Sequence, residues 1–92
     1  MIKLEELFTV NVYSVRDQYT GYGQLFTAQN DACAIRDFRL AVSNKESLLY
    51  SSAKDFDLMR LGTFDSELGC ISAEAPVVVA SGLCVAKEFA NA

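Results

Sequence analysis

The sequence contains no histidine and no tryptophan, and it has a single proline. Histidine is the commonest general base and the commonest metal ligand, so its absence argues against most enzyme mechanisms and most zinc sites. Three cysteines, Cys33, Cys70 and Cys84, are widely spaced and form no CxxC pair, which excludes a zinc knuckle. Because each has apolar neighbours, we expect buried, reduced thiols, as is usual in the cytosol.

The sequence also lacks a long apolar segment. No stretch reaches the length of about 20 residues that a transmembrane helix needs. The first six residues carry two glutamates where a signal peptide would be apolar. We therefore expect no membrane association and a cytoplasmic location.

Basic residues are few. The sequence has eight basic and twelve acidic residues, which gives a net charge of −4. Such a charge repels nucleic acid and anionic lipid at long range, but it permits a local basic groove. Hydrophobic residues make up 51% of the 92 residues. This composition predicts one domain over residues 1–92, with loosely held ends at 1–6 and 86–92, and it favours a homo-oligomer that buries apolar surface between subunits.

The most informative stretch, residues 25–44, predicts a short strand followed by the one long helix. Phe26 and Ala28 share a face at strand period, and Asn30 can cap the helix through its side-chain oxygen. Asp31 falls in the first turn, where the helix dipole favours a carboxylate. The helix is predicted to end at residues 43–44. Its expected apolar stripe consists of Ala32, Ile35, Phe38 and Val42.

Four other segments have the alternation or the β-branched content of strands. They are residues 8–15, 56–64, 70–73 and 77–80, the last following Pro76. Polar, glycine-containing stretches at 16–23 and 65–69 supply the turns. The predicted fold class is therefore α+β: two antiparallel β-hairpins form a four- to five-stranded sheet, with one central α-helix packed on it.

The segments that join and follow these elements are less regular. Residues 48–50 predict either a short strand or a turn packed under the helix, and residues 51–55 predict a single helical turn. Residues 83–92 have weak helical character. No internal repeat or low-complexity segment interrupts the chain.

Nothing in the sequence indicates catalysis. The carboxylate pairs Asp55/Asp57 and Asp65/Glu67 are typical of caps and turns, and no pattern encloses them. Glycines at residues 21–23 are not followed by a helix with a lysine, so they form no phosphate loop. Without histidine, the usual activation of a serine or threonine nucleophile is missing. We predict no enzyme activity, no cofactor and no metal site.

Aromatic rings and cationic groups favour a binding function instead. Bases stack on rings and phosphates meet guanidinium groups, which is what single-stranded nucleic acid requires. The first hairpin and the polar side and end of the helix supply such groups. The predicted nucleic-acid-binding residues are Arg16, Tyr19, Tyr22, Arg36, Arg39 and Lys45.

An alternative interpretation of the same residues is structural. The tyrosines, Tyr13 among them, would pack against the sheet, and the arginines would pair with acids. The expected acidic partners are Asp17, Asp37 and Glu46. A third candidate surface is the β-branched run Val77, Val78 and Val79, which is predicted to be an oligomer interface because such a run at a sheet edge invites pairing with another copy.

Several motifs occur in an order that resembles a known family. They are the runs Tyr13–Asp17, Phe26–Asp31, Ala34–Phe38, Asp55–Leu58 and Leu61–Asp65, followed by Gly69. Over residues 10–72 the chain resembles the small non-structural protein of gokushoviruses, the circular single-stranded DNA phages of the microvirus group (Microviridae).

The resemblance implies a DNA-binding protein without chemistry of its own, which helps replication move from duplex to single-strand synthesis during packaging. It would act in the cytoplasm of the infected bacterium, on single-stranded DNA or on the replication complex, with RNA as a possible competitor. The family supplies no catalytic residues, so the residues named above rest on physical argument. Because the chain is acidic, several copies along one groove would be needed for strong binding. The alternative function is a protein-interaction module that binds a phage or host replication protein.

Overall fold

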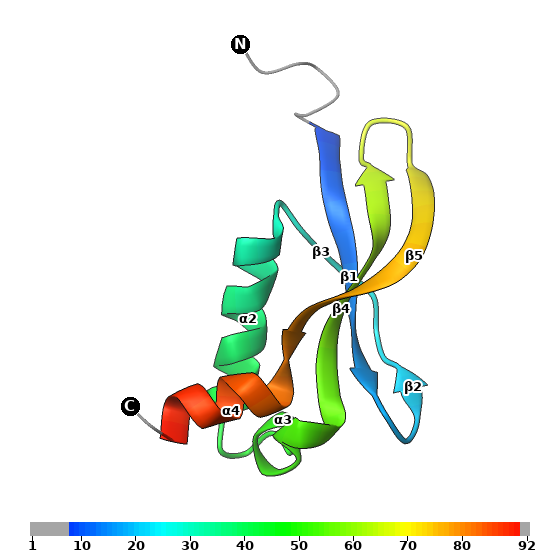
Figure 1. The fold of residues 1–92 in the computed structure, drawn as a ribbon. Helices are drawn as coiled ribbons and strands as arrows, with labels where there is room; N and C mark the ends of the chain where they lie inside the picture. The colour runs from blue at the N-terminus through cyan, green and yellow to red at the C-terminus, as the bar shows by residue number, and fades with distance from the viewer. Residues whose placement is uncertain (1–7, 91–92) are drawn as a thin grey trace.

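The computed structural model describes residues 8–90 of the chain, the last two by their backbone only. Three long strands twist around one another, and helix α2 lies along one side of them (Figure 1). The β4–β5 hairpin projects at one end of the molecule, and β2 and the shorter helices lie at the other.

The strands form one antiparallel sheet in the order β2–β1–β4–β5, and β3 pairs with β1 on the same edge as β2. Their bounds are β1 (Thr9–Asp17), β2 (Gly21–Tyr22), β3 (Phe26–Ala28), β4 (Phe56–Asp65) and β5 (Cys70–Ser81). The predicted α+β class, with two hairpins around a helix, is confirmed.

Within residues 9–90, four helical segments accompany the sheet. They are α2 (Asp31–Ser43), α3 (Leu48–Ser51), the 3₁₀ turn η1 (Ala53–Asp55) and α4 (Gly82–Ala90). The α2 helix begins where it was predicted to begin, because the side chain of Asn30 accepts a hydrogen bond from the Cys33 N–H. Of the two ends expected to be loose, residues 1–6 lie outside the described residues, and residues 86–90 belong to α4.

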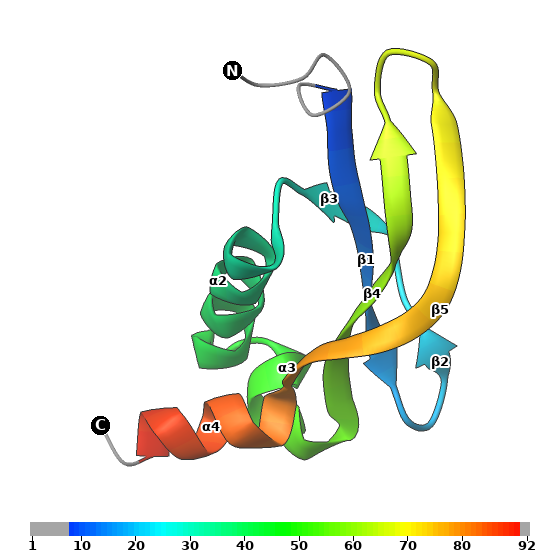
Figure 2. The same cartoon turned by 45° about the horizontal axis from the view of Figure 1, so that its top comes forward.

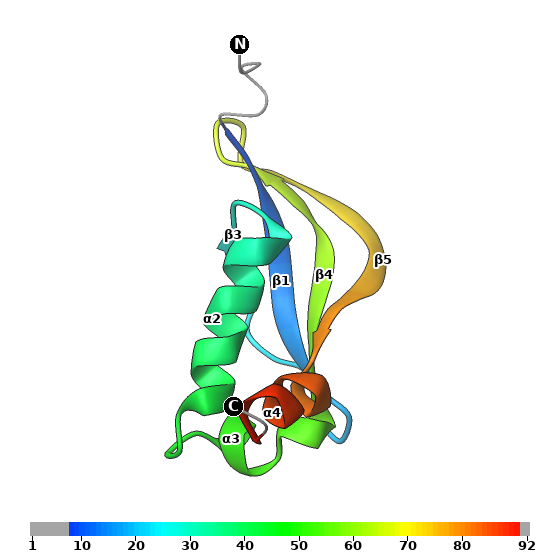
Figure 3. The ribbon, with the colours of Figure 1, turned by 60° about the vertical axis from the view of Figure 1, so that its left-hand side comes forward.

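The core lies between α2 and one face of the sheet (Figure 3). Its helical side consists of Ala34, Phe38 and Val42, which recur every four residues and are buried. The predicted stripe is therefore right at Phe38 and Val42 but wrong at Ala32, which is exposed. Ala34 belongs to the core instead, and Ile35 packs against the core partly buried.

Three register shifts bend the sheet. In the β1–β4 ladder, Val12 pairs with Gly62 and Tyr13 with Arg60, so Leu61 is skipped. In the β4–β5 ladder, one residue of β5 is skipped between the partners of Leu58 and Met59, and β5 advances by two additional residues between the partners of Arg60 and Gly62. Bulges of this kind increase the local twist. The β5 strand accordingly curves away from the straight path of its hairpin partner (Figure 2).

Three further expectations are corrected. The predicted strands at 70–73 and 77–80 are one strand, because Pro76 lies in the register shift, where a missing N–H costs little. Residues 48–50 form neither a strand nor a turn but the start of α3, which the Ser47 side chain caps by accepting from the Leu49 N–H. Cys70 and Cys84 are free but exposed rather than buried.

Candidate nucleic-acid interface

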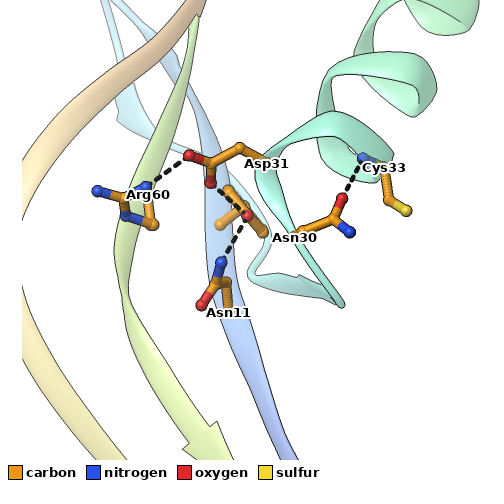
Figure 4. Close-up of polar contacts among 6 residues, drawn as sticks. Asn11, Asn30, Asp31, Cys33 and Arg60 are labelled. Atoms are coloured by element: carbon orange, nitrogen blue, oxygen red, sulfur yellow. Dashed lines mark hydrogen bonds and ion pairs between the residues drawn. The ribbon is translucent and has the colours of Figure 1, made fainter. Parts of the chain in front are cut away.

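A polar cluster fixes the helix to the sheet near the start of α2. The Tyr13 hydroxyl donates to Asp31 Oδ1 at 2.6 Å, and the Arg60 guanidinium donates to Asp31 Oδ2 at 2.6 Å. The amide of Asn11 donates to the Tyr13 hydroxyl at 3.0 Å. Figure 4 shows Asp31 reaching from the helix toward Arg60, beside the Asn30–Cys33 cap. Three elements, β1, α2 and β4, therefore meet at one carboxylate.

The electrostatics of this cluster favour a neutral tyrosine and a charged aspartate. Burial, together with the hydrogen bond to Asp31, raises the pKa of Tyr13 to about 12. The hydrogen bond from Tyr13, with the Arg60 guanidinium, lowers the pKa of the Asp31 carboxyl. The Tyr13 side chain is fully buried and stacks on Phe26, with ring centroids 5.7 Å apart. Tyr13 is thus a structural residue that packs against the sheet, as the alternative interpretation of the tyrosines expected.

The orientation of Tyr13 determines where its strand neighbours point. Tyr13 and Val15 pack on the α2 side of the sheet, so the alternation of a strand directs Ser14 and Arg16 to the opposite face. Ser14 is buried there and donates to the Gly23 carbonyl at 3.0 Å, which holds the chain after β2 against β1. Arg16 is exposed.

Arg16 and Tyr22 are cross-strand neighbours in the β1–β2 ladder and therefore share that face. The Tyr22 side chain is 46% exposed. Asp57 flanks Arg16 on the β4 side, but among residues 8–90 no ion pair or side-chain hydrogen bond engages the Arg16 guanidinium. A ring thus lies beside a guanidinium that forms no ion pair within residues 8–90, although Asp57 is its cross-strand neighbour on β4.

Tyr19 stands at the turn that joins β1 to β2. Its backbone N–H donates to Asp17 Oδ1 at 2.9 Å, and Gly21 has a φ of 92°, which suits glycine. The ring itself is 78% exposed. The turn is therefore fixed by local hydrogen bonding while its ring extends into solvent, as a stacking group requires.

The predicted residues of the helix are placed differently. Arg36 pairs with Asp37 at 3.7 Å, and Arg39 pairs with Glu88 of α4. Both arginines border a shallow apolar hollow on the outer side of α2. Lys45 is exposed in the loop that follows the helix. The alternative interpretation is thus confirmed for Arg36 and its partner Asp37, whereas Arg39 uses Glu88 rather than Glu46.

Five of the six predicted residues fall into two groups, and Lys45 lies apart in the loop after α2. Arg16, Tyr19 and Tyr22 are together at the end of the β1–β2 hairpin, a set that we call the hairpin patch. Arg36 and Arg39 lie on the outer side of α2, which covers the other face of the sheet. One nucleic-acid strand cannot contact both groups without wrapping around the molecule.

The sequence interpretation missed Arg60 and Asn11. The position of Arg60 depends on the bulge at Leu61, which brings Arg60 rather than Leu61 opposite Tyr13, whereas Asn11 lies two residues before Tyr13 on the same strand. Arg60 is the only basic residue of β4, and this was the available signal. Of the predicted oligomer interface, Val77 and Val78 are exposed, whereas Val79 packs against the core.

Within the described part of the chain, no group of three or more acidic, cysteine or histidine side chains could hold a metal ion. None of the helices described there is both long and apolar enough to cross a membrane.

Comparison with known families matches residues 10–85 to the family described as Phage ORF5 protein. Searches of the curated proteins and of the solved structures found no match. The matched range contains the hairpin patch, the polar cluster around Asp31 and the whole of β5. Since it covers most of the sequence, the chain belongs to the Phage ORF5 protein family and is a bacteriophage protein.

Proposed function

We propose that the chain is a phage non-structural accessory protein that binds single-stranded DNA and assists the switch to single-strand genome synthesis and packaging. The observation that carries the proposal is the hairpin patch, in which exposed Tyr22 lies beside Arg16 and exposed Tyr19 stands at the turn of the same hairpin. Within residues 8–90, the Arg16 guanidinium forms no ion pair. Family membership and the resemblance to the gokushovirus non-structural protein support the phage setting.

The chemistry of the hairpin patch suits a strand without defined sequence. Each base that stacks on an exposed ring contributes roughly 1–3 kcal/mol, and the contact tolerates any base. Arg16, the only cation of the patch, can meet a phosphate. A duplex offers no unstacked base to Tyr19 or Tyr22, so the patch discriminates in favour of single strands.

The net charge of −4 limits what one copy can do. Few phosphates are neutralised by a single hairpin patch, so the salt dependence of binding is shallow, with a slope of about −0.7 per contacted phosphate. Several copies bound along one strand would add their contacts. Light scattering with and without DNA measures this assembly, and it tests the predicted homo-oligomer in the same experiment.

Fluorescence anisotropy tests the proposal directly. A labelled oligothymidine is titrated with the full chain at low salt, and a duplex of equal length serves as the comparison. We expect a rise in anisotropy for the single strand at protein concentrations up to about 100 μM, the range of non-specific binding. No rise, or an equal rise for the duplex, would overturn the proposal.

The alternative is a protein-interaction module that binds a phage or host replication protein without touching DNA. One observation favours it: within residues 8–90, no strand pairs with the outer edge of β5. This edge lies away from the hairpin patch, so the two activities can coexist in one chain (Figure 1).

A further inference from the structure

β5 is the longest strand that the structure describes, and the proposed function does not use its outer edge. β5 pairs with β4 on one side only, and no segment among residues 8–90 pairs with its other side. All residues from Cys70 to Val78 are exposed. Except at Pro76, which has no N–H, such an edge presents open backbone N–H and C=O groups that another strand can satisfy.

The charge of this region has one sign. Between residues 61 and 86 the sequence contains three acidic residues and neither lysine nor arginine. The acids are Asp65, Glu67 and Glu74, of which Glu74 lies within β5 and Glu67 in the turn of the hairpin. Apolar side chains are exposed beside them, among them Ile71 and Val78. A partner that matches this edge must be extended, apolar in part and positively charged.

We propose that the open edge of β5, from Cys70 to Val78, receives an extended basic segment of another protein as an added strand. Backbone hydrogen bonds to β5 supply the geometry, and cations of the partner meet the carboxylates of the β4–β5 hairpin. The proposal goes beyond DNA binding, because the edge and the hairpin patch lie at different places in the fold (Figures 1 and 2).

A second copy of the chain matches the edge less well. Glu74 is the midpoint of the exposed run, so a symmetric antiparallel pairing of two β5 strands would set the two Glu74 carboxylates opposite each other. Like charges directly opposite destabilise a strand pair. Nucleic acid is disfavoured too, because the whole hairpin is anionic and phosphates would be repelled.

Nuclear magnetic resonance of the full chain with three synthetic peptides tests the proposal. The first peptide alternates lysine and valine, the second alternates glutamate and valine, and the third alternates lysine and proline, which is basic but cannot form a ladder strand. We expect shifts and slowed amide exchange confined to residues 70–78 with the first peptide alone. An equal response to the lysine–proline peptide, or a response spread over other surface carboxylates, would overturn the proposal.

Two variants with the same change in net charge sharpen the test. Glu74→Lys reverses the charge in the middle of the edge, whereas Glu46→Lys does so in the exposed loop after α2, where only the Glu46 backbone N–H is bonded, to Asn44. Glu74→Lys is expected to weaken binding of the lysine–valine peptide about fivefold, and Glu46→Lys less than about twofold. If both variants weakened binding of the peptide equally, the effect would come from overall charge, and the assignment of the peptide to the β5 edge would be refuted.

The same samples test the two other candidate partners of this edge, a second copy of the chain and nucleic acid. Light scattering that shows a dimer, with slowed exchange at β5 in the absence of peptide, would assign the edge to a second copy and overturn the proposal. So would slowed exchange at β5 on addition of oligothymidine. The anisotropy titration reports on the hairpin patch separately, so failure of either proposal leaves the other standing.

Discussion

The Tyr13 hydroxyl donates a 2.6 Å hydrogen bond to Asp31, which lies 18 residues further along the chain in the first turn of α2. Arg60 binds the other oxygen of the same carboxylate from β4. Both hairpins are thus tied to the helix at one point. With Tyr13 held on the helix side, Arg16 must project from the opposite face of β1, which places the hairpin patch away from α2.

Replacement of Tyr13 by phenylalanine should destabilise the protein. The ring still packs on Phe26, but the hydrogen bond to a charged, partly exposed carboxylate is lost, which costs about 1–2 kcal/mol. For a chain of this size the melting temperature should fall by roughly 4–8 °C for each kcal/mol. Tyr50→Phe is the control, because that side chain is exposed. Equal melting temperatures for Tyr13→Phe and the natural sequence would contradict the prediction.

Alkaline pH should reveal the same hydrogen bond. The pKa of Tyr13 is raised from 10.0 to about 12, so the folded protein holds this proton more tightly than the unfolded chain does. The stabilisation is complete below pH 10 and is lost as the pH rises from 10 to 12. Urea unfolding at a series of pH values should therefore show that the free energy of unfolding falls more steeply for the natural sequence than for Tyr13→Phe. Parallel curves would mean that Tyr13 titrates normally.

Acidic pH should act through Asp31. The Tyr13 hydrogen bond and Arg60 lower the pKa of this carboxyl below its ordinary value of 3.8, so its contribution to stability is present above that pH. It is lost as the pH falls through the pKa of the folded state. Asp31→Asn carries no such proton, so its stability should depend less on pH in this range. Chemical denaturation at descending pH measures the free energy of unfolding of both proteins. The difference between the natural sequence and Asp31→Asn must shrink as the pH falls.

Substitutions in the hairpin patch should weaken binding of single-stranded DNA. Arg16→Gln removes a cation without an acidic partner among the described residues, and Tyr22→Ala removes its neighbouring ring, with an expected loss of about 1–3 kcal/mol for a stacked base. Arg39→Gln is the matched control, because it removes the same charge from a residue already paired with Glu88. Anisotropy titration at low salt compares them. A larger loss for Arg39→Gln than for Arg16→Gln would move the interface to the helix.

Gly62 should tolerate no side chain. A Cβ atom at this position would lie 2.1 Å from the Ser72 carbonyl oxygen, a backbone atom that cannot rotate away. Gly62→Ala should therefore cost about 1–3 kcal/mol and disturb the bend of the β4–β5 hairpin. At Gly23, the nearest contact of an added Cβ is an ordinary 3.5 Å, so Gly23→Ala is the control. Thermal unfolding of both variants provides the comparison.

Much of the fold was predictable because it depends on local interactions. The Asn30 cap, the Asp31 position and the turn in which Asp65 accepts from the Glu67 and Leu68 N–H groups all involve residues within a few positions of one another. The candidate site was predicted in part. Arg16, Tyr19 and Tyr22 lie on one hairpin, as their spacing predicted, and their role in binding stays a prediction.

The sequence by itself determined the helix, the turns and the pairing of each hairpin, because hydrogen bonds between near neighbours and the period of apolar residues decide these. Only the tertiary structure decided that Tyr13 is buried, that Arg60 stands beside it and that the arginines of α2 face away from Arg16. These depend on the register of β1 against β4, in which Tyr13 pairs with Arg60, 47 residues further along the chain (60 − 13). A one-residue bulge at Leu61 changes which side chains meet across them, and no local pattern reports it.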